Sequence, residues 1–110
     1  MGISRTDLFD FEQNELAQLA RVFSHPARIA IVQYMADLGY CTNGDLVTHL
    51  GLAKPTVSQH LRDLKMAGLI KGTIIGNTVS YSIDDKFWKE AKKIFVELFD
   101  SINSDGSISN

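Results

Sequence analysis

Two short amphipathic segments separated by a tight turn constrain the fold of this chain more than any other feature. The first segment ends at Gly51, and only Gly51–Lys54 separate it from the start of the second at Pro55. The second spaces its apolar residues four and three positions apart, as a half-buried helix does: Val57, Leu61 and Leu64. Glycine commonly ends a helix and proline fits a first helical turn. These features together predict a helix-turn-helix.

The segments on either side of this motif predict three more helices and a hairpin. Apolar residues recur at helical spacing in residues 12–23 and 26–38, and again after Asp84, which is placed to cap the last helix. Residues 69–75 and 78–83 are instead rich in β-branched side chains, and Gly76-Asn77 between them suits a tight turn. The expected order is α-α-α-α-β-β-α. The fold class is therefore mainly α with a β-hairpin wing, a winged helix-turn-helix.

Length and composition place the chain among single-domain globular proteins. We expect one domain over residues 1–102 and a disordered tail over 103–110, which is polar and rich in Gly and Ser. No apolar run is long enough to span a membrane, the N-terminus does not resemble a secretory signal, and there is one cysteine. We therefore expect a cytoplasmic protein without an internal disulfide. The net charge is −2, yet residues 53–73 hold four basic residues and one acidic one, which is compatible with a small DNA-facing surface.

Three motifs in the expected order resemble one bacterial family. Phe23–Ile31 (FSHPARIAI) is similar to the signature of ArsR/SmtB-type repressors, and Leu52–Ile70 (LAKPTVSQHLRDLKMAGLI) is similar to their recognition segment. Gly76 and Tyr81 stand where that family has its wing turn and the tyrosine after it. The resemblance covers residues 15–100. It implies a homodimer formed through the terminal helices, binding to a palindromic double-stranded operator, and a signal that releases the DNA.

The polar side of the helix that begins at Pro55 holds the candidate DNA-binding residues. The resemblance assigns contact to Lys54, Pro55, Ser58 and Gln59, and also to Thr56. The residue types fit, because glutamine pairs with an adenine edge and lysine reaches guanine or phosphate. Arg62 and Lys65 are expected at phosphates. A solvated polar face is the alternative interpretation of the same pattern.

The start of this helix and the histidine within it each allow two interpretations. With no Ser or Asp before Pro55, the amides of Thr56 and Val57 are expected to be free to attract a phosphate; alternatively, the proline only starts the helix. His60 either contacts DNA or forms a hydrogen bond inside the domain, and the second is favoured. His25 and Arg28 are expected in packing or capping roles.

The wing carries no Lys or Arg at its tip, so minor-groove anchoring through arginine is not expected. Asn77 and Thr78 remain candidates for contact with the DNA backbone. Ile74 and Ile75 are expected to pack on the domain or at its edge.

The metal sites associated with the family are not expected here, and neither is a cofactor. The thiolate positions fall on Thr42, Gly44 and Val47, and the zinc-type positions fall on Asp85, Phe87, Leu98 and Ser101. Only Asp85 is a ligand of the required kind. The releasing signal is therefore expected to be an oxidant, an organic ligand or a partner protein. An atypical zinc site built from His25, His49 or His60 with an Asp or Cys41 is the remaining alternative, and the spacing gives it no support.

Cys41 is the candidate for an oxidant-sensing role, although a lone cysteine near a helix start is more often a small packed residue. An enzyme is not expected, since no nucleophile with a base partner and no phosphate-binding loop is present. Two functions remain: a dimeric repressor, or a winged-helix module that binds protein and has lost DNA binding. The acidic pI of about 5.8 and the uncharged wing tip favour the second.

Overall fold

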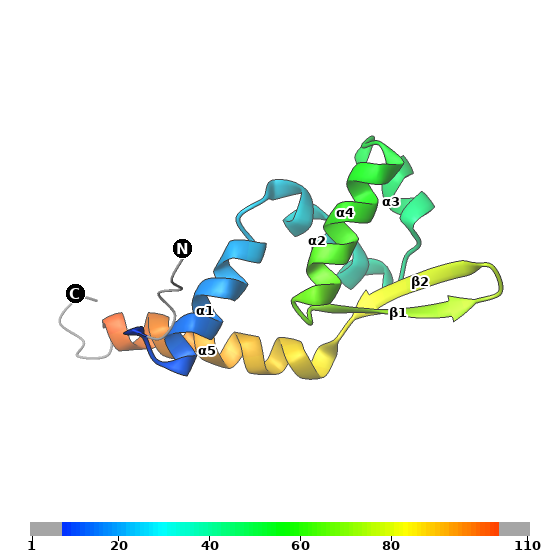
Figure 1. The fold of residues 1–110 in the computed structure, drawn as a ribbon. Coiled ribbons are helices and arrows are strands. Elements are labelled where there is room, and N and C mark those ends of the chain that lie inside the picture. Colours follow the sequence, from blue (N-terminus) through cyan, green and yellow to red (C-terminus); the bar gives the residue numbers. More distant parts are fainter. Residues whose placement is uncertain (1–7, 104–110) are drawn as a thin grey trace.

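The computed structural model describes residues 8–103 and contains the expected order of elements (Figure 1). The predicted winged helix-turn-helix is confirmed. Asn103, assigned to the tail, is the last residue of the final helix, and residues 104–110 of the predicted tail lie outside the described residues. The elements are α1 (Phe11–Val22), α2 (Pro26–Leu38), α3 (Asn43–Leu50), α4 (Lys54–Met66), β1 (Ile70–Ile75), β2 (Thr78–Ile83) and α5 (Asp85–Asn103).

Local capping interactions explain where most helices begin. Thr42 and Asp45 form the expected capping box of α3: the Asp45 amide donates to Thr42 Oγ1 at 3.1 Å, and the Thr42 amide donates to Asp45 Oδ2 at 2.9 Å. Asp84 caps α5 by accepting from the Phe87 amide at 3.2 Å. Gly51 follows α3 with a φ of 71°, the left-handed conformation that glycine adopts without strain. The sequence therefore fixes the turn between α3 and α4 locally.

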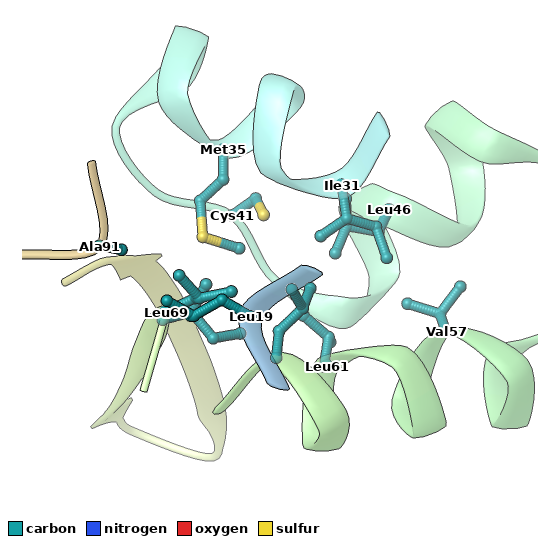
Figure 2. Packing of buried hydrophobic residues seen from close by; sticks show 11 residues of the cluster. Leu19, Ile31, Met35, Cys41, Leu46, Val57, Leu61, Leu69 and Ala91 are labelled. Atoms are coloured by element: carbon teal, nitrogen blue, oxygen red, sulfur yellow. The ribbon is translucent and has the colours of Figure 1, made fainter. Parts of the chain in front are cut away.

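The core lies between α2, α3, α4 and the first residues of β1 (Figure 2). The predicted stripe of α4 is buried, and Ile31, Met35, Leu46 and Leu69 face it from the neighbouring elements. Close packing of this kind fixes α4 against α3, because interior side chains interdigitate with few voids. The packing therefore turns the polar side of α4 toward solvent.

A short backbone bridge connects the loop before α3 to the wing. The Cys41 amide donates to the Tyr81 carbonyl at 2.9 Å, and the Tyr81 amide donates to the Cys41 carbonyl at 2.8 Å. Because Tyr81 lies on β2, this pair attaches the base of the hairpin to the start of the helix-turn-helix.

The distal half of the hairpin extends beyond the helices (Figure 1). β1 and β2 pair antiparallel, with Ile74 opposite Val79 and Ile75 opposite Thr78. The expectation that Ile74 and Ile75 pack on the domain or at its edge is wrong, since their side chains are 78% and 64% exposed. A two-stranded hairpin has a covered face only where another element packs on it, and no helix reaches this tip.

The terminal helices α1 and α5 pack against each other at the end of the molecule away from the hairpin tip (Figure 1). Trp88 secures α5 to the body, because its indole Nε1 donates to the Leu69 carbonyl at 2.9 Å and its ring lies 5.5 Å from that of Phe23. Several apolar side chains of this pair of helices and of the residues just before α1 stay exposed: Leu8, Phe9, Phe11, Val96, Leu98, Phe99 and Ile102.

Candidate nucleic-acid interface

The outward side of α4 carries most of the predicted DNA-binding residues. We define the recognition face as the exposed residues of α4 with polar side chains that point away from the buried stripe, which are Lys54, Thr56, Gln59, Arg62 and Lys65. Pro55 is also exposed, and Ser58 is half-buried beside them. The face carries three cations and no acid. It therefore has the charge that a phosphate backbone attracts.

The first turn of α4 has no side-chain cap. Ala53 is the cap residue, so the helix begins one residue before Pro55, earlier than expected. The expectation that the Val57 amide is free is wrong, because it donates to the Ala53 carbonyl at 3.1 Å. The amides of Lys54 and Thr56 precede Val57, the first amide of α4 to donate within the helix, and no side chain caps them. An uncapped helix start with a lysine at its first position favours an anion.

The wing and the start of α4 enclose an open cavity of about 570 Å³. Lys54 and Ser58 line it from α4, and Asn77 lines it from the hairpin turn. Asn43 of α3 donates from Nδ2 to Ser58 Oγ at 2.8 Å, which restrains the serine hydroxyl within this cavity. The structure thus brings the predicted wing residue Asn77 to the same groove as the start of the recognition face.

A polar network runs along the recognition face and into the body. Arg62 donates to Gln59 Oε1 at 2.6 Å, and Gln59 Nε2 donates to Asp63 Oδ1 at 3.0 Å. The second oxygen of Asp63 accepts from Arg28 at 2.7 Å. Asp63 is the residue of this network that the sequence reasoning missed. Asp63 lies four residues after Gln59, and this helical spacing could have predicted their contact from the sequence. The ion pair between Asp63 and Arg28 spans 35 residues and has no such sequence signal.

His60 is buried within the domain rather than presented with the recognition face. It is 7% exposed, its Nδ1 accepts from Arg28 Nε at 3.4 Å, and its ring lies 4.5 Å from that of His25. Burial lowers the pKa of His60 below its usual range, and the nearby His25 and Arg28 lower it further against the opposing effect of Asp63. This geometry fits the packing interpretation. His25 also caps α2, since its Nδ1 accepts from the Ala27 amide at 3.3 Å.

Cys41 is a core residue with a suppressed thiolate. Its side chain is fully buried. Burial, followed by the charge of Asp45, raises the pKa of this thiol to about 11. Since the thiolate is the reactive form, the structure favours the packed interpretation over the oxidant-sensing one.

We expect Cys41 to resist alkylation in the native protein. At pH 8 a thiol with this pKa holds roughly a hundredfold less thiolate than an unperturbed one, and burial restricts access further. The measurement is a mass-spectrometric time course of iodoacetamide labelling, in buffer and in urea. A Lys92→Cys variant in a Cys41→Ala background supplies an exposed thiol as the control. Equal labelling rates for Cys41 and the control would restore the oxidant-sensing interpretation.

The described residues contain no cluster of three or more His, Cys, Asp or Glu side chains placed to hold a metal. At the positions aligned with the thiolate site, the Thr42 hydroxyl caps α3, and Gly44 and Val47 have no ligand atom in their side chains. This donor set does not fit the metal sites associated with the resemblance. None of the helices within residues 8–103 is both long and apolar enough to cross a membrane.

Comparison with known proteins agrees with this geometry. Residues 25–71 match the family described as "Bacterial regulatory protein, arsR family". The chain is 32% identical over 96 residues to the HTH-type transcriptional regulator CmtR of Mycobacterium tuberculosis, covering 87% of this chain and 80% of that protein. It is 40% identical over 68 residues to the repressor SmtB of the same species, covering 62% of this chain and 50% of SmtB.

A solved structure extends the similarity to the wing and the terminal helices. The transcriptional repressor BigR from Xylella fastidiosa matches with a TM-score of 0.64 and 26% identity, over 91% of this chain and 96% of BigR. These relatives are transcriptional regulators rather than enzymes. The chain belongs to the ArsR family of bacterial DNA-binding transcriptional regulators.

Proposed function

We propose that this protein is a dimeric, sequence-specific transcriptional repressor that a non-metal signal releases from its operator. The observation that carries the proposal is the cationic recognition face of α4, whose uncapped start shares an open groove with the wing. A helix that is packed on one side and polar on the other fits the width of the DNA major groove. The names of SmtB and BigR as repressors support the direction of regulation.

Each residue of the recognition face has a role that follows from its chemistry. Gln59 presents a carboxamide, which pairs with an adenine edge. Lys54, the free amides of the first turn, and Arg62 and Lys65 supply cations and donors for phosphates. Pro55, Thr56 and Ser58 lie in the first two turns of α4. Asn77 lines the same cavity as Ser58 from the wing, and its role is contact with the DNA backbone. His60 takes no direct part, because it is buried against Arg28 and His25.

The exposed apolar side of α1 and α5 supports a homodimer. On α5 the apolar residues recur three and four positions apart at Phe95, Leu98, Phe99 and Ile102, which forms one continuous stripe. Contiguous exposed apolar surface of this kind marks an interaction site. A second copy joined here would place two recognition faces on one palindromic site.

The donor sets within residues 8–103 and the buried state of Cys41 support two candidate signals. An organic ligand or a partner protein at the terminal helices would act on the same surface that supports the dimer. Release would then follow from a change in the relative placement of the two recognition faces.

Substitution of the recognition face tests the proposal. We expect Lys54→Ala and Gln59→Ala each to weaken binding to the protein's own upstream DNA by about tenfold, because each removes one phosphate or base contact. Lys54→Ala also makes the salt dependence shallower by about one in log–log slope, while Gln59→Ala leaves the slope unchanged. Fluorescence anisotropy of the reduced, chelator-treated protein measures both effects, with scrambled DNA as competitor.

The matched control is Lys93→Ala, which removes an exposed lysine from α5, far from the start of α4 (Figure 1). We expect this variant to bind as the wild type does. If all three variants bind equally well, the recognition face is assigned wrongly.

The second candidate function is a winged-helix module that recognises protein. The exposed isoleucines of the wing tip favour it, because they suit an apolar partner better than a phosphate backbone. Wild-type binding that is weak and independent of sequence would support this function over the repressor.

A further inference from the structure

The polar network along the recognition face contains one acidic residue, Asp63, whose contacts suggest a role in sequence discrimination. We propose that Asp63 is a positioning residue: it holds the Gln59 carboxamide in one orientation and thereby sets the sequence preference of α4. This inference rests on the proposed function, since it assumes that Gln59 contacts a base. The inference adds a residue that affects base recognition by holding Gln59 in place, without contacting the DNA.

Two contacts of opposite character define the orientation of Gln59. Its Nε2 donates to Asp63 Oδ1 at 3.0 Å, and its Oε1 accepts from Arg62 at 2.6 Å. If the carboxamide turned over, its oxygen would face a carboxylate and its N–H groups would face a guanidinium. Neither contact would then be a hydrogen bond. The two ionised neighbours therefore select one of the two orientations of the amide.

The selected orientation leaves the group able to read a base. The amide nitrogen keeps one N–H and the amide oxygen keeps one lone pair after these contacts are made. Adenine offers N7 as an acceptor and N6–H as a donor in the major groove. One N–H of the amide and one lone pair of its oxygen thus stay available for adenine while both neighbours remain bound. The rotamer freedom that DNA binding would otherwise remove is already restricted.

Asp63 is in turn fixed from outside α4. Its Oδ2 accepts from Arg28 at 2.7 Å, and Arg28 also donates to the Val22 carbonyl at 3.4 Å. The side chains of Arg28 and Asp63 are 18% and 29% exposed, so the pair is partly shielded from solvent. The side chains of Arg28 and Asp63 thereby connect the end of α1 to the Gln59 carboxamide on α4.

The test compares the ratio of binding to upstream DNA over scrambled DNA, measured by fluorescence anisotropy. We expect Asp63→Ala to lower this ratio by about tenfold, within the range of one bidentate base contact. Binding to scrambled DNA should stay the same or become tighter, since the change removes a negative charge from a DNA-facing helix. A purely structural role would weaken binding to both DNAs together.

A double-mutant cycle separates action through Gln59 from other effects. In a Gln59→Ala background, Asp63→Ala should leave the ratio unchanged. Asp63→Asn, which keeps an acceptor for Gln59 but loses the ionised partner of Arg28, should give an intermediate ratio, and it serves as the second variant if Asp63→Ala does not fold by circular dichroism.

Two results would overturn the inference while leaving the proposed function in place: a wild-type ratio in both Asp63 variants, or an equal fall in the ratio with and without Gln59. A wild-type protein with no preference for its upstream DNA would overturn the proposed function itself.

Discussion

Replacing Leu64 with alanine is expected to lower the free energy of unfolding by about 2–5 kcal/mol, the range for a leucine truncated in a packed core. Leu64 is fully buried on α4, within the cluster that α2, α3 and β1 complete. A loss of this size is a large fraction of the roughly 5–15 kcal/mol that stabilises a small protein. Because the same residue fixes α4, we expect DNA binding to fall in proportion to the unfolded fraction. Urea denaturation at a fixed protomer concentration measures the change.

Met66→Ala provides the control on the same helix. Its side chain is 81% exposed, so its truncation removes little buried area and should change stability by less than about 0.5 kcal/mol. If Leu64→Ala and Met66→Ala were equally stable, α4 would not be packed as described.

Replacing Phe99 with glutamate is expected to dissociate the proposed dimer. Phe99 is 56% exposed in the isolated chain and lies within the apolar stripe of α5, with its ring 6.3 Å from that of Phe95. Aromatic residues at the centre of an interface contribute about 2 kcal/mol or more each, and a buried charge without a partner adds a further cost. We therefore expect the dimer dissociation constant to rise by at least about a hundredfold. Sedimentation equilibrium measures it directly.

Operator affinity should fall along with the dimer, since each protomer would then bind its half-site without the effective concentration that the second provides. Lys93→Ala is again the matched control, because it changes the net charge by the same one unit on the same helix. A Phe99→Glu protein that remains dimeric would place the subunit interface elsewhere on the surface.

Local rules predicted the parts of this fold that local interactions determine. The capping residues Thr42 and Asp84 start their helices as expected, and Gly51 ends α3. The period of the apolar residues predicted which side of α4 is buried, because a helix places residues three and four apart on one face. The polar side that remained carries the residues that we propose to contact DNA.

The differences between expectation and structure have two physical origins. The sequence did not reveal that α4 begins one residue before Pro55, because Ala53 has no side-chain oxygen and its capping position leaves no signal. Ile74 is a β-branched apolar residue of the kind that strands often bury, but its burial depends on whether another element covers the hairpin. The exposure of Ile74 follows from its place in the folded chain, which the spacing of apolar residues in the sequence does not predict.

The importance of Asp63 also depends on tertiary position. Its sequence neighbours indicate only an exposed helical carboxylate, whereas the folded chain brings Arg28 to it from another helix. Long-range ion pairs have no periodic signature. The link from the local pair of Gln59 and Asp63 to Arg28 could therefore be recognised only once α2 and α4 were placed side by side.

The backbone bridge between Cys41 and Tyr81 has a consequence for how a half-site is matched. The bridge attaches the wing to the loop before α3, and the buried stripe packs α4 against α3, so α3 and the loop before it hold both the wing and α4. In the proposed complex, the distance between the groove that α4 would enter and the DNA strand that the wing would approach is then set within one protomer. We expect operators with altered spacing inside a half-site to be rejected. Tolerance of altered spacing between half-sites would have to come from the junction of the two subunits.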